Sequence, residues 1–139
     1  MSSTFRRIVA IAGALGVAFL VGHGVNLIAQ QIHPCPAGVE CSDRAALRAA
    51  LEAGQIPLIK YGLILLGWLL GAYAGGLAAI RWGRWGPGVW ITAAGFTFLV
   101  YGWLSAAPHP EWMWIGGLAG CPLFALGGGR QTVNVRAVP

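Results

Sequence analysis

The stretch PLIKYGLILLGWLLGAYAGGLAAI, residues Pro57–Ile80, decides the fold of this chain. Its one charged side chain is Lys60, close to the start. A helix needs about 20 apolar residues to cross the roughly 30 Å hydrocarbon layer of a membrane. Because lipid offers the backbone no hydrogen-bonding partner, a segment of this kind crosses as a helix. We therefore predict a transmembrane helix over residues 57–80.

Three further apolar runs cover residues 8–29, 87–106 and 112–128, the last at the short end of the range for a span. Hydrophobic residues make up 57% of the chain and charged residues 9%, with a mean hydropathy of +0.68. A soluble domain is about a quarter charged, so these values exclude an ordinary soluble protein. No run alternates with the period of two that marks a strand. The sequence predicts an all-α integral membrane protein, residues 1–139 forming one four-transmembrane-helix bundle.

The charges are sorted between the alternating connections of this bundle. All four carboxylates fall in residues 30–56 and 107–111: Glu40, Asp43, Glu52 and Glu111. Six of the nine cations fall in the other connections and at the two ends: Arg6, Arg7, Arg81, Arg84, Arg130 and Arg136. Short segments rich in basic residues stay in the cytoplasm. We expect an N-in/C-in protein of the bacterial inner membrane, with an outer loop at 30–56 and a cytoplasmic tail at 129–139.

Two alternatives concern the basic segments. The first run follows a basic start and could be a signal peptide, although residues 27–29 make a poor cleavage site. The net charge of +5 could indicate nucleic-acid binding. The arginines are dispersed over short turns, however, which favours contact with anionic lipid headgroups and no nucleic-acid partner.

Small residues recur every four positions on the predicted helices. The second helix carries Gly67, Gly71, Gly75 and Ala79. The first carries a similar ridge, and the last has a glycine pair: Ala10, Ala14, Ala18, Gly22, Gly116 and Gly120. Such ridges let helix backbones approach closely in a membrane. They predict tight packing either within the chain or with other transmembrane helices, including a second copy.

Two shorter segments give local predictions. Residues 42–53 are expected to form a short amphipathic helix in the outer loop, with Ser42 as a cap and Gly54 as a stop. Pro122 predicts a kink in the last helix. The run Gly127–Gly129 has no following helix signal, and we expect it to end that helix.

His23 is the one conventional ionisable side chain well inside a predicted span. Asn26 and Gln30 follow it at offsets of three and seven, so the three residues share one face of the first helix. An intramembrane ionisable residue is a candidate functional site. The stripe predicts either a solute or proton path, or a neutral histidine that is hydrogen-bonded to another helix.

The outer segments hold two histidines and two cysteines. Cys35 and Cys41 face an oxidising compartment in the predicted topology, which suggests a disulfide. His33 and His109 are further outer-face candidates; with the cysteines they supply zinc-ligand types, but at spacings of no standard zinc site. No metal or cofactor is predicted. His109 is also explained as a polar residue of the rigid turn 108–110.

No sequence pattern for an enzyme is present. The spans hold no paired carboxylates, and the chain has no nucleophile elbow, phosphate loop or His-Glu-x-x-His motif. The absence of acids inside the spans also argues against ion-coupled transport. These absences favour a protein that is not an enzyme, and they leave the question open.

Three stretches in this order are similar to a known family: Pro34–Gly38 leading to Ser42 and Asp43, Gly71–Ala79, and Pro108–Met113. They resemble an uncharacterised family of small four-helix proteins of the bacterial inner membrane, over nearly the whole chain. The resemblance implies the four-helix topology and brings no established activity. Family members carry Glu and His where this chain has Asn26 and Gln30, which removes a protonatable pair.

Together these patterns favour a non-enzymatic integral membrane protein in the lipid bilayer. It would act as an accessory subunit of a membrane complex or as a small homo-oligomer, assembled through the small-residue ridges. One alternative is a transporter or channel protomer that uses His23, Asn26 and Gln30. A second is a membrane thiol oxidoreductase that uses Cys35 and Cys41.

Overall fold

The computed structural model describes residues 3–40 and 43–135. These residues form five helices and no strand: α1 (Ser3–Ile32), α2 (Arg44–Glu52), α3 (Leu58–Gly83), α4 (Gly86–Ala106) and α5 (Glu111–Val135). The prediction of an all-helical chain is confirmed. Helices α1, α3 and α4 are each long and apolar enough to cross a membrane, which indicates a membrane protein.

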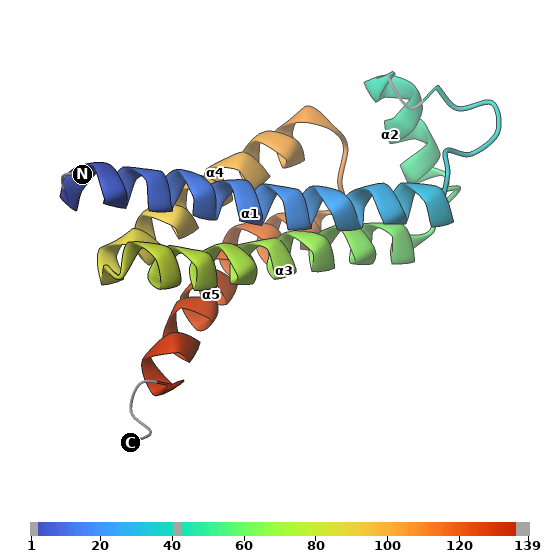
Figure 1. Ribbon diagram of the computed structural model, residues 1–139. Helices are drawn as coiled ribbons and strands as arrows, with labels where there is room; N and C mark the ends of the chain where they lie inside the picture. The colour runs from blue at the N-terminus through green and yellow to red at the C-terminus, as the bar shows by residue number, and fades with distance from the viewer. Residues whose placement is uncertain (1–2, 41–42, 136–139) are drawn as a thin grey trace.

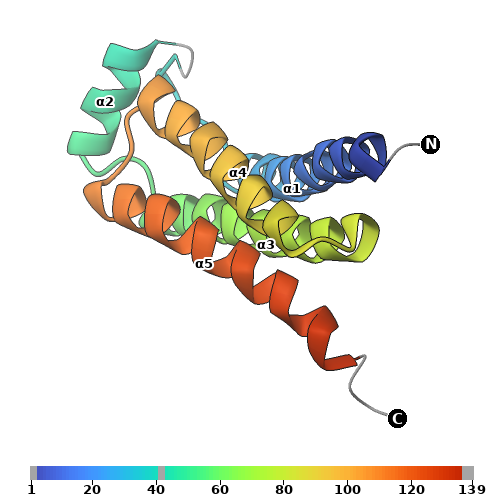
Figure 2. The same cartoon turned by 90° about the vertical axis from the view of Figure 1, so that its left-hand side faces the viewer.

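The four long helices lie alongside one another, with α3 in contact with α1, α4 and α5 (Figure 1). The N-terminus, the α3–α4 turn and the C-terminal end of α5 lie at one end, which we call the arginine end. Helix α2 and the α4–α5 turn lie at the opposite end, which we call the α2 end. Towards the arginine end, α5 diverges from the other helices (Figure 2).

Helices α1 and α3 meet through their small residues. A Cβ atom added to Gly71 would overlap the carbonyl oxygen of Ala18, and one added to Gly75 would lie 2.8 Å from the Ala18 Cβ. At Gly67 an added Cβ would lie 2.8 Å from the Cβ of Val25. Only a hydrogen atom fits at these glycines, so the two backbones come as close as glycine permits.

A second close contact joins the neighbouring face of α3 to α5. A Cβ atom at Gly76 would overlap the Ala125 carbonyl, and one at Gly128 would overlap the Tyr73 carbonyl. The expectation that Gly127–Gly129 ends the last helix is therefore wrong. Glycine is a poor helix former in isolation, but here it lets α5 approach α3, and the packing stabilises the helix through these positions.

The helices extend beyond the apolar runs used to predict the spans. Helix α1 begins at Ser3 and reaches Ile32, and α5 continues through Pro122 to Val135, where a cytoplasmic tail was expected from 129. Apolar composition marks the part of a helix that suits lipid, whereas the backbone hydrogen bonds continue into the polar ends. Ser42, Cys41 and Arg136 lie outside the described residues.

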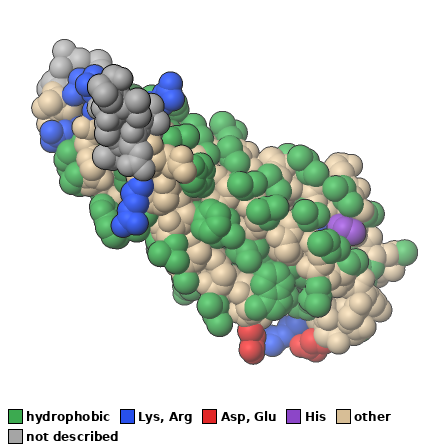
Figure 3. Space-filling model, turned by 90° about the horizontal axis from the view of Figure 1, so that it is seen from below, with side chains coloured by type: hydrophobic (Ala, Val, Ile, Leu, Met, Phe, Trp, Pro, Cys, Tyr) green, Lys and Arg blue, Asp and Glu red, His purple; other side chains and the backbone are tan. Residues whose placement is uncertain are grey.

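Apolar side chains are spread over the face of the molecule seen in Figure 3, and the Lys, Arg, Asp and Glu side chains visible on that face lie towards its ends. Large examples are Leu20, Trp90, Phe98 and Ile115, of which Phe98 is 75% exposed. The interior is lined with small residues, including Ala14 and Ala18, neither of which is exposed. Large side chains such as Phe96, Leu104 and Met113 are buried as well, so the exposed apolar surface is additional to an apolar core, which is unusual for a water-facing protein.

Candidate functional site

The turn between α4 and α5 carries His109 between two prolines. Proline fixes its own φ angle and disfavours the helical conformation of the residue before it, so Pro108 and Pro110 keep this segment out of both helices. The His109 Nδ1–H donates a hydrogen bond to the carbonyl oxygen of Ala107 at 2.8 Å. This bond fixes the protonated nitrogen and the orientation of the ring.

Two buried aromatic residues of α3 contact the His109 ring. Tyr61 meets it edge-on and Trp68 at a tilt, each with ring centroids 5.9 Å apart. Burial lowers the pKa of His109 below its usual value of 6.5, and its bonds to the Ala107 and Leu104 carbonyls offset part of this effect. His109 is therefore neutral at pH 7.

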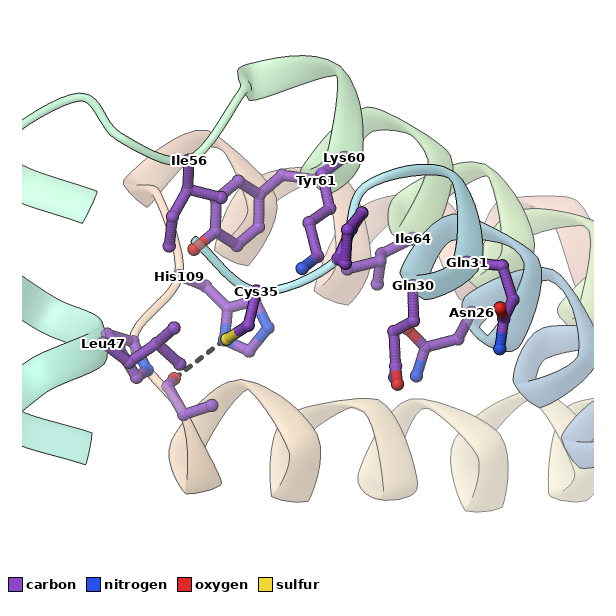
Figure 4. A pocket seen from close by; sticks show the side chains of 13 residues that line it. Asn26, Gln30, Gln31, Cys35, Leu47, Ile56, Lys60, Tyr61, Ile64 and His109 are labelled. Atoms are coloured by element: carbon purple, nitrogen blue, oxygen red, sulfur yellow. Dashed lines mark hydrogen bonds between the residues drawn. The ribbon is translucent and has the colours of Figure 1, made fainter. Parts of the chain in front are cut away.

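A cavity of about 550 Å³, which we call the main cavity, opens at the α2 end (Figure 4). Its polar lining comes from α1, α3 and the α4–α5 turn: Asn26, Gln30, Gln31, Lys60, Tyr61 and His109. Ile56 and Ile64 add apolar wall. The lining thus combines amides, a phenol, an imidazole and a single ammonium group, and among the described residues no carboxylate contributes to it.

A second cavity of about 270 Å³, the side cavity, adjoins the main cavity between α1, α3 and α4. Both are lined by Asn26, Ile64, Ala107 and His109, so the two cavities share a wall. Gly22, His23, Trp68 and Trp103 complete most of the side cavity. Two indole and two imidazole rings thus contribute to its lining, beside small and aliphatic residues.

The aromatic rings form a continuous chain between His109 and His23. Trp68 stacks on Trp103 with centroids 6.0 Å apart, and Trp103 contacts Phe19 at 5.8 Å. Phe19 in turn stacks on His23 at 5.4 Å. Since Trp68 also contacts His109, side chains from α1, α3, α4 and the turn hold one another in place around the side cavity.

A third cavity of about 390 Å³, the rim cavity, lies under α2. Its charged lining comes from α2 and the start of α5: Arg44, Arg48, Glu52 and Glu111. Arg48 and Glu52 form an exposed ion pair at 3.2 Å, so part of this charge is already balanced. Ala107 and His109 line this cavity as well as the other two, which places the α4–α5 turn at the junction of all three.

The residues of the predicted stripe differ in their surroundings. Asn26 is half-buried and lines both the main and the side cavity. Gln30 is exposed and lines the main cavity. His23 is exposed at the edge of the side cavity, where it stacks on Phe19; within the described residues it has no hydrogen bond to another helix.

The remaining candidates are spread over the same end. Cys35 lines the main cavity, whereas Cys41 lies outside the described residues, so their disulfide stays a prediction. His33 is half-buried in the first loop and lines none of the three cavities. In the described part of the chain, no three His, Cys, Asp or Glu side chains are grouped to hold a metal ion.

Sequence reasoning missed four residues of this site. They are Lys60, Tyr61, Trp103 and Ala107, to which the sequence patterns assigned no role in a site. The signal that was present is the pair of prolines around His109, because a rigid turn holds its central side chain in a fixed position. The helix contacts that surround this turn are not visible in a single sequence.

No known protein family, curated protein or solved structure matches this chain.

Proposed function

We propose that the chain is an integral membrane protein in which α1, α3, α4 and α5 each cross a bacterial inner membrane. The apolar sides support a lipid environment for all four helices. The described cations at the arginine end support an N-in/C-in orientation, because basic termini and turns stay in the cytoplasm: Arg6, Arg7, Arg81, Arg84 and Arg130. We also propose that the chain is a member of the family of small four-helix inner-membrane proteins that it resembles.

In this orientation α2 is an amphipathic helix on the outer rim. Asp43 caps it by accepting a hydrogen bond from the Ala45 backbone N–H at 2.8 Å. Ala50 is buried, and Leu47 and Leu51 pack against the bundle core, while Arg44 is exposed to water. Helix α2 thereby forms one wall of the rim cavity.

The function that the geometry supports best is non-enzymatic binding of a small ligand at the outer end, in a protein that serves as an accessory subunit of a membrane complex. The observation that carries this proposal is the meeting of three cavities at Ala107 and His109. The polar face of α1 lines two of these cavities. Polar side chains are costly within a membrane helix, and a binding site accounts for their presence.

The glycine ridges contribute to this function indirectly. Helix α1 packs against Gly67, Gly71 and Gly75, and α5 packs against Gly76. A partner helix therefore cannot contact these glycines. A complex or homo-oligomer would have to use the exposed apolar sides. The ridges instead close the bundle beneath the cavities.

A transporter or channel protomer is the second candidate, and the stripe of His23, Asn26 and Gln30 along the cavities favours it. Deeper in the bundle, the contact of Gly71 with Ala18 leaves no space between α1 and α3. A transport path between α1 and α3 would therefore require these two helices to separate, whereas binding at the outer end requires no such change.

The test of the binding proposal is native mass spectrometry of the full chain extracted directly from membranes into nanodiscs. We expect a retained small molecule or lipid in the wild type and its loss in Ala107→Leu, which fills the junction of the cavities. Ala94→Leu, on the exposed side of α4, is the matched control and should retain the ligand. No retained ligand in the wild type, or equal retention in Ala107→Leu, would contradict the proposal.

A further inference from the structure

Lys60 gives the main cavity a positive charge that no carboxylate of its described lining balances. Lys60 extends into the cavity from the first turn of α3 (Figure 4). Within the described part of the chain it forms no ion pair, and the cavity lining contains no carboxylate. A half-buried ammonium group without a counter-charge favours an anion in the adjacent space.

Other groups of the same wall favour an anion too. Helix α3 begins at Leu58 after Pro57, which provides no side-chain cap, so the positive end of the helix dipole lies beside the cavity. The amide nitrogens of Asn26 and Gln30 and the hydroxyl of Tyr61 are available as neutral donors along the lining.

The adjoining side cavity has a different chemistry. Trp68 and Trp103 line it together with His23, and no Lys, Arg, Asp or Glu among the described residues contributes. An apolar or flat group fits such a ring-lined space. A molecule that occupies both cavities would therefore have an anionic end and an apolar end.

We propose that the main cavity binds the carboxylate or phosphate group of an amphipathic anion through Lys60, with the apolar part of the molecule in the side cavity. This inference rests on the proposed binding function and names its ligand class. Two sources supply the chemistry: the headgroup of an anionic phospholipid, and a water-soluble aromatic acid. In either case Lys60 is the group that distinguishes the anion from a neutral molecule.

The experiment measures binding to the full chain in nanodiscs. In the lipid arm, native mass spectrometry compares retention of phosphatidylglycerol with that of phosphatidylcholine. In the soluble arm, calorimetry follows benzoate, with benzyl alcohol as its neutral analogue, in phosphatidylcholine nanodiscs. Binding in the first arm alone identifies a lipid headgroup, and binding in the second alone identifies a soluble acid; each supports the proposal.

The variants separate charge from packing. Lys60→Met keeps an unbranched apolar side chain and should weaken anion binding about tenfold, the loss expected for one charge-assisted hydrogen bond. Lys60→Arg should bind within about threefold of the wild type. Arg81→Gln removes the same net charge from the other end of α3, where it lines none of the three cavities, and should leave anion binding unchanged. Equal thermal unfolding of all three variants confirms that they are folded.

Two results would overturn the ligand class: Lys60→Met binding anions as tightly as the wild type, or the neutral lipid and benzyl alcohol binding as tightly as their anionic counterparts. If a neutral molecule is retained from native membranes and Ala107→Leu removes it, the binding function stands and the anion proposal fails. If neither native extraction nor either arm places any molecule in the wild-type cavities, both proposals fail.

Discussion

Helices α1 and α3 form a closed contact over one part of their length and an open cavity over another. In the middle, Gly71 lies against the backbone of Ala18. Towards the α2 end, the same two helices present Asn26 and Lys60 to the main cavity. The residues differ between the two parts: glycine and alanine let the helix backbones touch, whereas Asn26 and Lys60 are larger polar residues that line the cavity. The same two helices thus close the bundle below the candidate site and line the site itself.

Gly71→Ala should disrupt the close contact between α1 and α3. The added methyl would overlap the Ala18 carbonyl, which belongs to a helix backbone and cannot rotate away. We expect a loss of about 3 kcal/mol in the free energy of unfolding, at the upper end of overpacking effects. Detergent-induced unfolding followed by tryptophan fluorescence measures it.

Gly62→Ala is the matched control on the same helix. An added Cβ at Gly62 has no atom within 4 Å, so this variant should be as stable as the wild type or slightly more stable through helix propensity. Equal destabilisation by the two substitutions would show that the contact between α1 and α3 is not the cause.

The first loop offers a test of how the α2 end is held together. If Cys35 and Cys41 form the predicted disulfide, reduction should lower the free energy of unfolding by about 2 kcal/mol. Alkylation of the unfolded chain without reductant should then modify Cys121 alone, which is a free buried cysteine. If all three cysteines are alkylated before reduction, the predicted disulfide is absent. The thiol oxidoreductase hypothesis then loses its support.

Asp43→Ala tests the helix that walls the rim cavity. The substitution removes the hydrogen bond to the Ala45 N–H, and loss of such a cap costs about 1 kcal/mol of helix stability. Helix α2 does not contact the middle of the bundle. We therefore expect faster amide exchange in residues 44–52 and unchanged exchange in the middle of α1 and α3. Faster exchange throughout the bundle would contradict this separation of the two regions.

The smallest expected effect is the pH dependence at His109. Its folded-state pKa lies below its usual value of 6.5, so the neutral ring stabilises the fold fully above pH 6.5, and this stability is lost as the pH falls through the folded-state pKa. Unfolding measured between pH 7.5 and 5 should show a decline in the wild type that is reduced in His109→Asn. His33→Asn controls for the loss of an imidazole; identical profiles for wild type and His109→Asn would refute the assignment.

The helices could be predicted from the sequence because lipid-spanning length and composition are local properties. The small-residue ridge containing Gly71 could be recognised for the same reason. The partner of each face could not: Gly76 lies next to Gly75 in the sequence, yet the first packs on α5 and the second on α1. Helical spacing places residues on a common face and leaves open what that face contacts.

The candidate site was less predictable than the helices. Asn26 could be selected as a polar residue near a span end, and it does line two cavities. His109 gains its central place only because the α4–α5 turn lies over the ends of α1 and α3, which is a non-local feature. His23 was selected for its depth within a predicted span, and it is exposed on the surface of α1, since depth along a helix does not tell its outer side from its inner side.

Thiol labelling on α1 tests most directly whether the cavity is open to water while the apolar side of the same helix is not. In intact cells that produce a chain with its native cysteines replaced, a membrane-impermeant thiol reagent is added from outside to Asn26→Cys and, separately, to Leu20→Cys. Asn26 lines the cavities, whereas Leu20 is 69% exposed on the apolar side. The account predicts labelling of Asn26→Cys and none of Leu20→Cys. Absence of labelling at Asn26→Cys, or labelling only after the cells are opened, would contradict an outward-facing cavity.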